Sequence, residues 1–553
     1  MRKYLVITLC IFIGISIGIY IQPLVSSDNI FQQIKKFDQV LQTAYKNYVE
    51  EVDSQQLVEA AIKGMLNELD VHSVYIDAED MKRVNEDFQG SFDGIGVEFD
   101  VLEDTLTVIA PISGGPSEAL GILSGDKIVK IDGENAVGIS RTEVPKKLKG
   151  PKGTIVELDI FRAGEKEILH FSVVRDKIPL YTVDAYYMIE GTDIGYVQVN
   201  RFAQTTIDEL RSALFELKKQ GMEKIMLDLR GNPGGYLNQA FNMAEEFLSS
   251  GDTIVYTKGR LKQFDEYYIG RGRSQFQKMP LIVLINAGSA SASEIVSGSI
   301  QDLDRGLIVG ETSYGKGLVQ RQYQLPDGSA YRITIAKYYT PSGRCIQRPY
   351  KDKDKYRHLV GRLELEEGSY IKDAMKKIKD QVEKINADAL ENDKDLINLD
   401  SLPLYKTKNG RTVFGAGGVT PDYIIKSDTI NKMSIEFRRK NLFNEFTDKL
   451  MHSKDGVALK EKYADNYSDF YKNFTVDKKM IKSFKELAVS KDIEWDEELY
   501  KKDEDYITCS IKAFIARVIW DRNKMTQIFS QVDKQLNKAI DLFPDAERIT
   551  KNK

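Results

Sequence analysis

The sequence predicts a multidomain chain of mixed α/β and α+β class. We expect N-terminal helices, a β-rich domain, an α/β core built from βαβ units, and a helical C-terminal extension. The first observation behind this prediction is length, since 553 residues exceed what one hydrophobic core usually serves. The second is composition, because 29% charged and 42% hydrophobic residues are ordinary for a globular protein. The third is periodicity, which changes several times along the chain.

Residues 1–27 are expected to direct the chain out of the cytoplasm. Arg2 and Lys3 precede an uncharged apolar run over residues 4–21, whose length is at the lower end of what spans a bilayer as a helix. A signal anchor in the inner membrane fits this run, and a cleaved signal peptide is the alternative. Both interpretations predict an exported protein, periplasmic or in the cell envelope, whose body lies outside.

The next two regions differ in their periodicity. In residues 28–88 apolar side chains recur every three to four positions, which predicts helices. Residues 89–176 carry short alternating runs separated by glycine and aspartate turns. One such pair of runs, Thr154–Phe161 and Glu167–Val174, is expected to form a hairpin, so this region is predicted to be a small β-rich domain.

Residues 177–349 are predicted to form the α/β core. Ile194–Val199 and Lys224–Leu229 have the pattern of buried strands, and the amphipathic helix Thr206–Lys219 separates them. Strand, helix and strand in this order imply a βαβ unit and a largely parallel sheet. The unbroken apolar run Leu281–Ile285 predicts a further strand, buried on both faces, and helical spacing resumes shortly after it.

Residues 350–553 form the last region, and composition excludes several classes of partner. From residue 428 onward the chain is charge-rich with helical periodicity, which favours a scaffold or a homo-oligomer contact made by these helices. A net charge of −5 offers no basic surface for nucleic acid. Only Cys345 and Cys509 lie outside the targeting segment, and no His/Cys cluster has metal-ligand spacing, so we expect neither a metal nor a cofactor.

The small-residue turn after the strand 281–285 carries the candidate catalytic residues. A serine at a strand-to-helix junction is held rigidly beside backbone N–H groups that have no helical partner, as a nucleophile beside an oxyanion hole requires. The residue types do not decide which of Ser289, Ser291 and Ser293 is the nucleophile. No histidine lies in this stretch, so Lys316, set between two glycines, is the simplest base if burial or a nearby cation lowers its pKa.

A purely structural alternative exists for both residues. Ser291 and Glu294 have the spacing of a capping box, in which the serine only satisfies the first helical amides and the glutamate reaches back. Lys316 would then be a solvated lysine in a surface turn. Residue types alone do not decide between this alternative and a Ser-Lys dyad.

Three blocks of sequence resemble the carboxy-terminal processing, or tail-specific, serine proteases. They are DLRGNPGG at residues 228–235, GSASASEIVSG at 288–298 and GETSYGKGLVQ at 310–320. The resemblance implies that Ser291 is the nucleophile and Lys316 the general base. It further implies that Gln320, one helical turn's spacing after the lysine, orients the base.

The same resemblance implies two binding features. One is an oxyanion hole made by the amide of Ala292 and by a glycine of the Asn-Pro-Gly-Gly turn, either Gly234 or Gly235. The other is a PDZ domain over residues 89–176, in which a loop would bind the terminal carboxylate of an extended peptide. The residues of that loop are Gly94, Ile95 and Gly96.

These expectations together describe a serine endopeptidase that cleaves exported polypeptides near their C-termini. Its partners would be polypeptide substrates with free C-termini, held by the PDZ-like domain. A catalytically latent PDZ scaffold or a chaperone-like binding protein is the competing class, and an esterase or amidase using the same dyad is a third.

Overall fold

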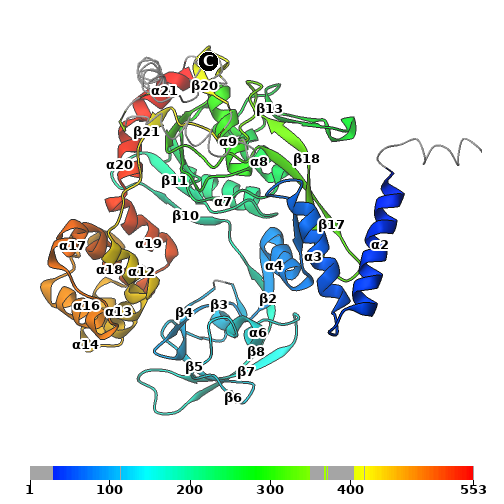
Figure 1. Ribbon diagram of the computed structural model, residues 1–553. Helices are drawn as coiled ribbons and strands as arrows, with labels where there is room; N and C mark the ends of the chain where they lie inside the picture. Colours follow the sequence, from blue (N-terminus) through cyan, green and yellow to red (C-terminus); the bar gives the residue numbers. More distant parts are fainter. Residues whose placement is uncertain are drawn as a thin grey trace, which may run out of the picture. The chain divides into compact units, whose positions relative to one another are not determined.

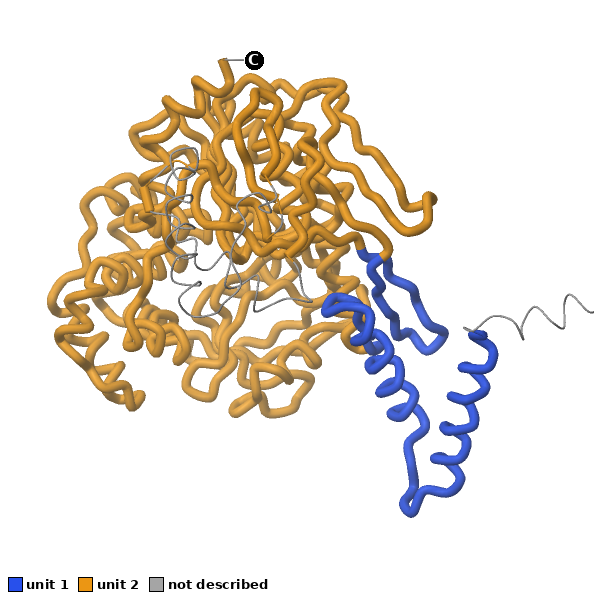
Figure 2. The backbone as a smooth tube through the Cα atoms, turned by 45° about the horizontal axis from the view of Figure 1, so that its top comes forward, with its two compact units in different colours: residues 1–78, 320–334 blue, residues 79–319, 335–553 orange. Residues whose placement is uncertain are grey.

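The computed structural model describes residues 29–112, 114–348, 367–368, 370, 404–415 and 417–551 (Figure 1). The chain divides into two compact units, residues 1–78 with 320–334 and residues 79–319 with 335–553 (Figure 2). The targeting segment predicted over residues 1–27, with its apolar run 4–21, lies outside the described residues. Among the described helices, none combines the length and apolar character needed to cross a bilayer.

The described part of the first unit contains two helices and short strands. Its elements are α2 (Ile30–Asn47), α3 (Ser54–Asn67), β1 (Val74–Ile76), and the parts of β17 (Leu318–Gln324) and β18 (Ala330–Tyr339) that fall within 320–334. Both helices begin at a capping side chain: Asn29 accepts an amide of α2 and Asp53 accepts two amides of α3. β1 pairs antiparallel with β18, and β17 also pairs with β18. The helices predicted for this region are confirmed.

The second unit begins at residue 79, within α4 (Ala78–Gln89), and continues with the predicted β-rich domain. The elements of that domain are β2 (Ser91–Gly94), β3 (Val97–Leu102), β4 (Thr105–Pro111), α5 (Pro116–Ala119), β5 (Lys127–Ile131), β6 (Glu134–Asn135), α6 (Val144–Leu148), β7 (Ile155–Phe161), β8 (Leu169–Val174) and β9 (Asp176–Pro179). The sheet has the order β3-β4-β5-β7-β8, so β3 is an edge strand. Val108, Ile128 and Ile160 are fully buried in its core. The predicted hairpin is β7 with β8.

A six-stranded sheet in the order β10-β11-β12-β15-β16-β21 forms the α/β core. Its strands are β10 (Val183–Met188), β11 (Ile194–Val199), β12 (Lys224–Asp228), β15 (Leu281–Ile285), β16 (Leu307–Gly310) and β21 (Tyr423–Ile424). Neighbouring strands from β11 to β21 run parallel, and β10 runs antiparallel to β11. The predicted βαβ unit is confirmed.

Helices cover both faces of this sheet, which explains why its central strands are continuous apolar runs. One face packs against α7 (Thr206–Lys219), α8 (Leu237–Glu245) and α9 (Ala292–Asp302). The other face packs against α20 (Lys534–Asp541) and α21 (Phe543–Lys551), whose apolar residues share a core with Ile282 and Leu284 (Figure 1). The sheet and its cover therefore extend well past residue 349, where the sequence suggested that the core ends.

Smaller elements flank the core, and a helical domain precedes α20. The flanking elements are β13 (Thr253–Gly259), η1 (Lys262–Phe264), β14 (Glu266–Ile269), η2 (Gln275–Lys278), β19 (Leu404–Lys406) and β20 (Thr412–Phe414). The helical domain comprises α12 (Lys432–Arg439), α13 (Leu442–Met451), α14 (Lys454–Tyr463), α15 (Tyr467–Asn473), α16 (Lys478–Ser490), α17 (Glu497–Lys502), α18 (Glu504–Ile519), α19 (Arg522–Phe529) and η4 (Ser530–Val532). Phe437, Phe484 and Ile511 are fully buried in its aromatic-rich core. The predicted helical character is confirmed.

Candidate active site

Ser291 occupies a strained turn at the carboxyl end of a parallel strand. β15 ends at Ile285 and α9 begins at Ala292, so Ser291 is the residue that caps the helix. Its backbone has φ +53° and ψ −108°, a conformation that residues with a side chain rarely adopt. Such strain persists only where the surroundings enforce it, and it is typical of functional sites.

Burial separates the three candidate serines. Ser289 and Ser293 are both 0% exposed. The Ser289 hydroxyl donates to the carbonyl oxygen of Leu229 at 2.8 Å, and the Ser293 hydroxyl donates to that of Asn232 at 2.9 Å. Ser291 is only partly buried. Of the three hydroxyls, that of Ser291 is therefore the one that a substrate can reach.

The predicted capping box is present, but Glu294 also contacts residues 313–316, which we call the lysine loop. The carboxylate of Glu294 accepts the amide of Ser291 at 2.8 Å. It also accepts the amides of Gly315 at 2.7 Å and Lys316 at 2.9 Å, and the hydroxyl of Ser313 at 2.5 Å. Burial raises the pKa of Glu294, and these four donors oppose the rise. Capping and a catalytic role are thus compatible at this turn.

Tyr338 contacts the same two residues from β18. Its hydroxyl lies 3.0 Å from the carbonyl oxygen of Ser291 and 2.8 Å from that of Lys316. Tyr338 is 1% exposed, and burial raises the pKa of its phenol well above the ordinary value. Lys316 itself is partly buried. The backbones of Ser291 and Lys316 are therefore joined through two buried side chains.

The glycine turn after β12, residues 231–235, packs directly on the turn that carries Ser291. We call the latter, residues 286–291, the nucleophile turn. Gly234 has φ +98°, and a Cβ atom added to it would lie 2.8 Å from the Cβ atom of Ser291 and 2.9 Å from the amide nitrogen of Ala292. The Gly234 amide donates to the side-chain oxygen of Asn232 at 2.9 Å. Within the described part of the chain, the amides of Ala292 and Gly235 donate to no protein oxygen. These two amides are available to an oxyanion.

Gln320 belongs to the first unit and has a partner there. Its side-chain amide donates to the carbonyl oxygen of His72. The backbone around His72 is ordered by Asp70, whose carboxylate accepts the His72 amide at 2.7 Å and the Ser73 amide at 2.8 Å. The orienting role expected for Gln320 stays a prediction.

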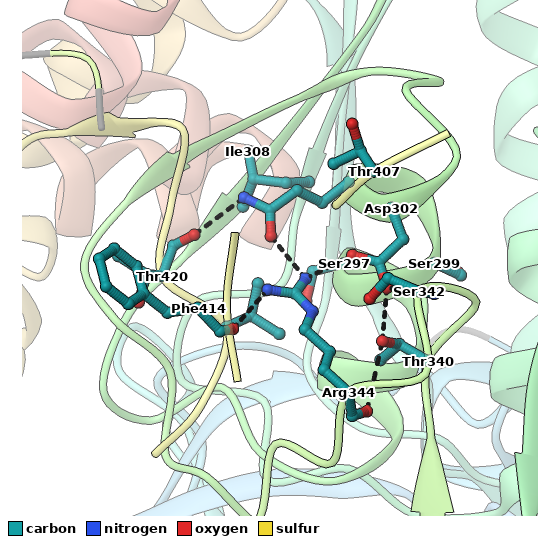
Figure 3. Close-up of polar contacts among 12 residues, drawn as sticks. Ser297, Ser299, Asp302, Ile308, Thr340, Ser342, Arg344, Thr407, Phe414 and Thr420 are labelled. Atoms are coloured by element: carbon teal, nitrogen blue, oxygen red, sulfur yellow. Dashed lines mark hydrogen bonds and ion pairs between the residues drawn. The ribbon is translucent and has the colours of Figure 1, made fainter. Parts of the chain in front are cut away.

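A buried ion pair and two hydrogen bonds fix the C-terminal end of α9 (Figure 3). Asp302, near the end of the helix, lies 2.8 Å from the guanidinium of Arg344, and both side chains are 0% exposed. Thr340 donates to Asp302 at 2.5 Å, and Arg344 donates to the carbonyl oxygen of Phe414 at 2.7 Å. The helix that begins at the candidate nucleophile is thereby fixed to the turn after β18 and to β20.

The loop before β3 has the features of a carboxylate-binding loop. Ile95 is 2% exposed, and its carbonyl oxygen accepts both the amide and the hydroxyl of Ser117. Gly96 has φ +74°, and a Cβ atom there would lie 3.0 Å from Ile178. Within the residues that the structure describes, the amides of Ile95 and Gly96 donate to no protein oxygen. Gly94 ends β2 just before these two amides, beside the free edge of β3.

Two features of the site were not anticipated. Tyr338 was not singled out, although a tyrosine that alternates with Ala336 on the buried side of a strand is a detectable signal. Glu294 was recognised only as a capping residue. No group of three or more His, Cys, Asp or Glu residues in the described part of the chain could hold a metal ion.

Comparison with known families agrees with this architecture. Residues 193–354 match peptidase family S41, and residues 94–173 match the PDZ domain family. Residues 22–80 match a family described as the activating protease CtpB N-terminal domain, and residues 434–521 match DUF8443, a family of unknown function. The fold and the matched families define a peptidase that carries a PDZ domain.

Curated relatives specify the family further. A carboxy-terminal-processing protease of Bartonella bacilliformis is 38% identical over 352 residues, covering 63% of this chain and 80% of the relative. The processing protease CtpA of Bacillus subtilis is 32% identical over 427 residues, covering 73% and 87%. The solved photosystem II D1 C-terminal processing protease is 30% identical with a TM-score of 0.33, covering 58% and 86%. This chain belongs to the carboxy-terminal processing protease family.

Proposed function

We propose that the chain is a serine endopeptidase whose Ser291 and Lys316 form a catalytic dyad, and that it cleaves exported polypeptides near their C-termini. The observation that carries the proposal is the placement of Ser291. It is the reachable serine of the three, it sits in a strained turn packed against Gly234, and its amide shares one carboxylate with the amide of Lys316.

The chemistry follows from these positions. Neutral Lys316 accepts the proton of the Ser291 hydroxyl as Oγ attacks the carbonyl carbon of the scissile peptide bond. The amide of Ala292 stabilises the oxyanion together with a glycine amide, and the free amide of Gly235 favours that residue over Gly234. Protonated Lys316 then donates its proton to the leaving amine. Water hydrolyses the acyl-enzyme with Lys316 again as the base, and Gln320 is predicted to orient that lysine.

Substrate capture is the second part of the proposal. The free amides of Ile95 and Gly96, with Gly94 before them, bind the terminal carboxylate of a polypeptide, and the peptide adds to the edge of β3. Export to the periplasm or cell envelope, anchoring by residues 4–21 and self-association through the C-terminal helices remain predictions from the sequence.

The dyad is tested by cleavage of an unfolded protein. We expect Ser291→Ala and Lys316→Ala each to lower kcat/KM at least about 10³-fold, because each removes a group that forms or breaks bonds. Ser297→Ala is the matched control, since among the described residues this buried serine of α9 donates only to the carbonyl oxygen of Ser293. Full activity of either dyad variant contradicts the mechanism. Hydrolysis of esters without hydrolysis of proteins points to the esterase alternative.

Tail binding is tested with the inactive Ser291→Ala chain, so that cleavage does not deplete the peptide. A fluorescent peptide with a free C-terminal carboxylate is compared with its C-terminal amide by anisotropy. We expect the amide to bind at least about tenfold more weakly, because charge-assisted hydrogen bonds to the carboxylate are lost. Equal binding contradicts carboxylate capture. An inert parent chain that still prefers the carboxylate supports the latent scaffold.

A further inference from the structure

Two buried side chains outside the proposed dyad connect the nucleophile turn to the lysine loop. Glu294 uses one carboxylate oxygen, Oε2, to accept the amides of both Ser291 and Lys316. Tyr338 places its hydroxyl within hydrogen-bond distance of the carbonyl oxygens of the same two residues. The backbones of Ser291 and Lys316 are thus joined on their N–H side by an acceptor and on their C=O side by a donor.

The sequence separation makes these contacts informative. Ser291 precedes α9, whereas Lys316 follows β16, so no single helix or strand sets the spacing between them. Glu294 is 0% exposed and Tyr338 is 1% exposed. Hydrogen bonds in such a dry environment are strong, and unpaired groups left behind are costly. Removal of the Glu294 carboxylate or the Tyr338 hydroxyl is therefore expected to be costly at this turn.

We propose that Glu294 and Tyr338 are positioning residues that set the distance between the nucleophile and its base. The inference rests on the proposed roles of Ser291 and Lys316. Proton transfer between two side chains needs heavy atoms within roughly 3 Å, and a misplacement of about 1 Å can cost about 10²-fold in rate. Neither residue touches the substrate in this proposal, and each acts through the backbone of the dyad.

The chemistry of Glu294 explains why a neutral isostere is a sharp probe. Its Oε1 accepts the Gly315 amide and the Ser313 hydroxyl, and its Oε2 accepts the Ser291 and Lys316 amides. Glutamine keeps one acceptor oxygen and replaces the other with an NH₂ group. That group is a donor, so it cannot accept the pair of donors that the replaced carboxylate oxygen accepts. Glu294→Gln therefore preserves size while breaking one pair of contacts.

The experiment measures kcat and KM per active site, counted with an organophosphorus probe that reacts to completion with the nucleophile. The variants are Glu294→Gln and Tyr338→Phe, alone and together. Their controls are Glu246→Gln, a 6% exposed carboxylate paired with Arg211, and Tyr187→Phe, whose buried hydroxyl has no partner within the described residues. Counting sites separates slow chemistry from loss of folded protein.

We expect each test variant to lower kcat about 10- to 100-fold with KM changed less than threefold, and the double variant to lose less than the product of the two. The controls should keep kcat within twofold. If Glu294→Gln does not fold, Tyr338→Phe alone decides. Test variants that match the controls per counted site overturn the inference, even when Ser291→Ala and Lys316→Ala are inactive. Activity in those two variants overturns the proposed function instead.

Discussion

Replacing Gly234 by alanine is expected to disable the site without unfolding the core. The added Cβ atom would lie 2.8 Å from the Cβ atom of Ser291, whereas ordinary van der Waals contact begins at 3.4 Å. The two turns must therefore separate by at least 0.6 Å, the difference between these distances. The neighbouring atoms are the backbone of Ala290 and Ala292, which cannot rotate away as a flexible side chain would.

The expected size of the effect follows from that displacement. Oxyanion donors act over a narrow range of distance, and loss of one typically costs about 10²–10³-fold in kcat. We expect Gly234→Ala to lower kcat about 10²-fold. The positive φ adds about 1–2 kcal/mol of backbone strain to the folded state.

Gly231→Ala is the matched control for this substitution. Gly231 belongs to the same turn and also has a positive φ, +69°, but a Cβ atom there meets nothing within 4 Å. Gly231→Ala should lower the melting temperature, because its backbone is strained, and should change kcat little. Peptide hydrolysis per active site and thermal unfolding are measured for both variants. If Gly234→Ala retains kcat within threefold of the parent, the packing of this turn on the nucleophile is not required for catalysis.

Three further outcomes are expected. Arg344→Met leaves Asp302 as an uncompensated buried charge, so the free energy of unfolding in urea should fall by about 3–5 kcal/mol, and a fall below about 1 kcal/mol contradicts this account. Burial raises the pKa of Asp70, but its hydrogen bonds lower it more, so the folded-state pKa lies below 3.8. The stability that ionised Asp70 contributes to the fold is therefore present above pH 3.8 and is lost as the pH falls through the folded-state pKa. Amide protection in the turn after Asp70, corrected for intrinsic exchange, should follow this dependence and lose it in Asp70→Asn. Burial raises the pKa of the Cys509 thiol to about 12, so iodoacetamide at pH 8 should alkylate it only after unfolding, as peptide mass spectrometry can show.

The parts of the core that were predictable share one physical property. Ile194–Val199 and Leu281–Ile285 have the predicted bounds because strands buried on both faces are mostly apolar, and each of these two strands is followed by an asparagine. The helix Thr206–Lys219 was predictable because one face of it is buried against that sheet. Local pattern and final structure agree where burial is decided by neighbours in sequence.

The rest depended on contacts between distant residues. Helical periodicity indicated helices near the C-terminus, but not that α20 and α21 cover the sheet of the core. The sequence alone does not distinguish Ser289, Ser291 and Ser293. The structure does, because the hydroxyls of Ser289 and Ser293 are buried and hydrogen-bonded to backbone carbonyl oxygens. The alternation with Ala336 predicts that Tyr338 is buried, but both of its backbone partners lie at least one secondary-structure element away, so no spacing rule identifies those partners.

The cover supplied by α20 and α21 has a consequence for how the chain matures. These helices are the last elements of the described chain, and the apolar side chains of Ile282 and Leu284 pack against them. A ribosome delivers them only after every strand of the sheet has been made. During synthesis Ile282 and Leu284 therefore lack their contacts with these two helices, and a chain that stops before residue 534 does not acquire them. Completion of the peptidase core is in this way coupled to synthesis of α20 and α21.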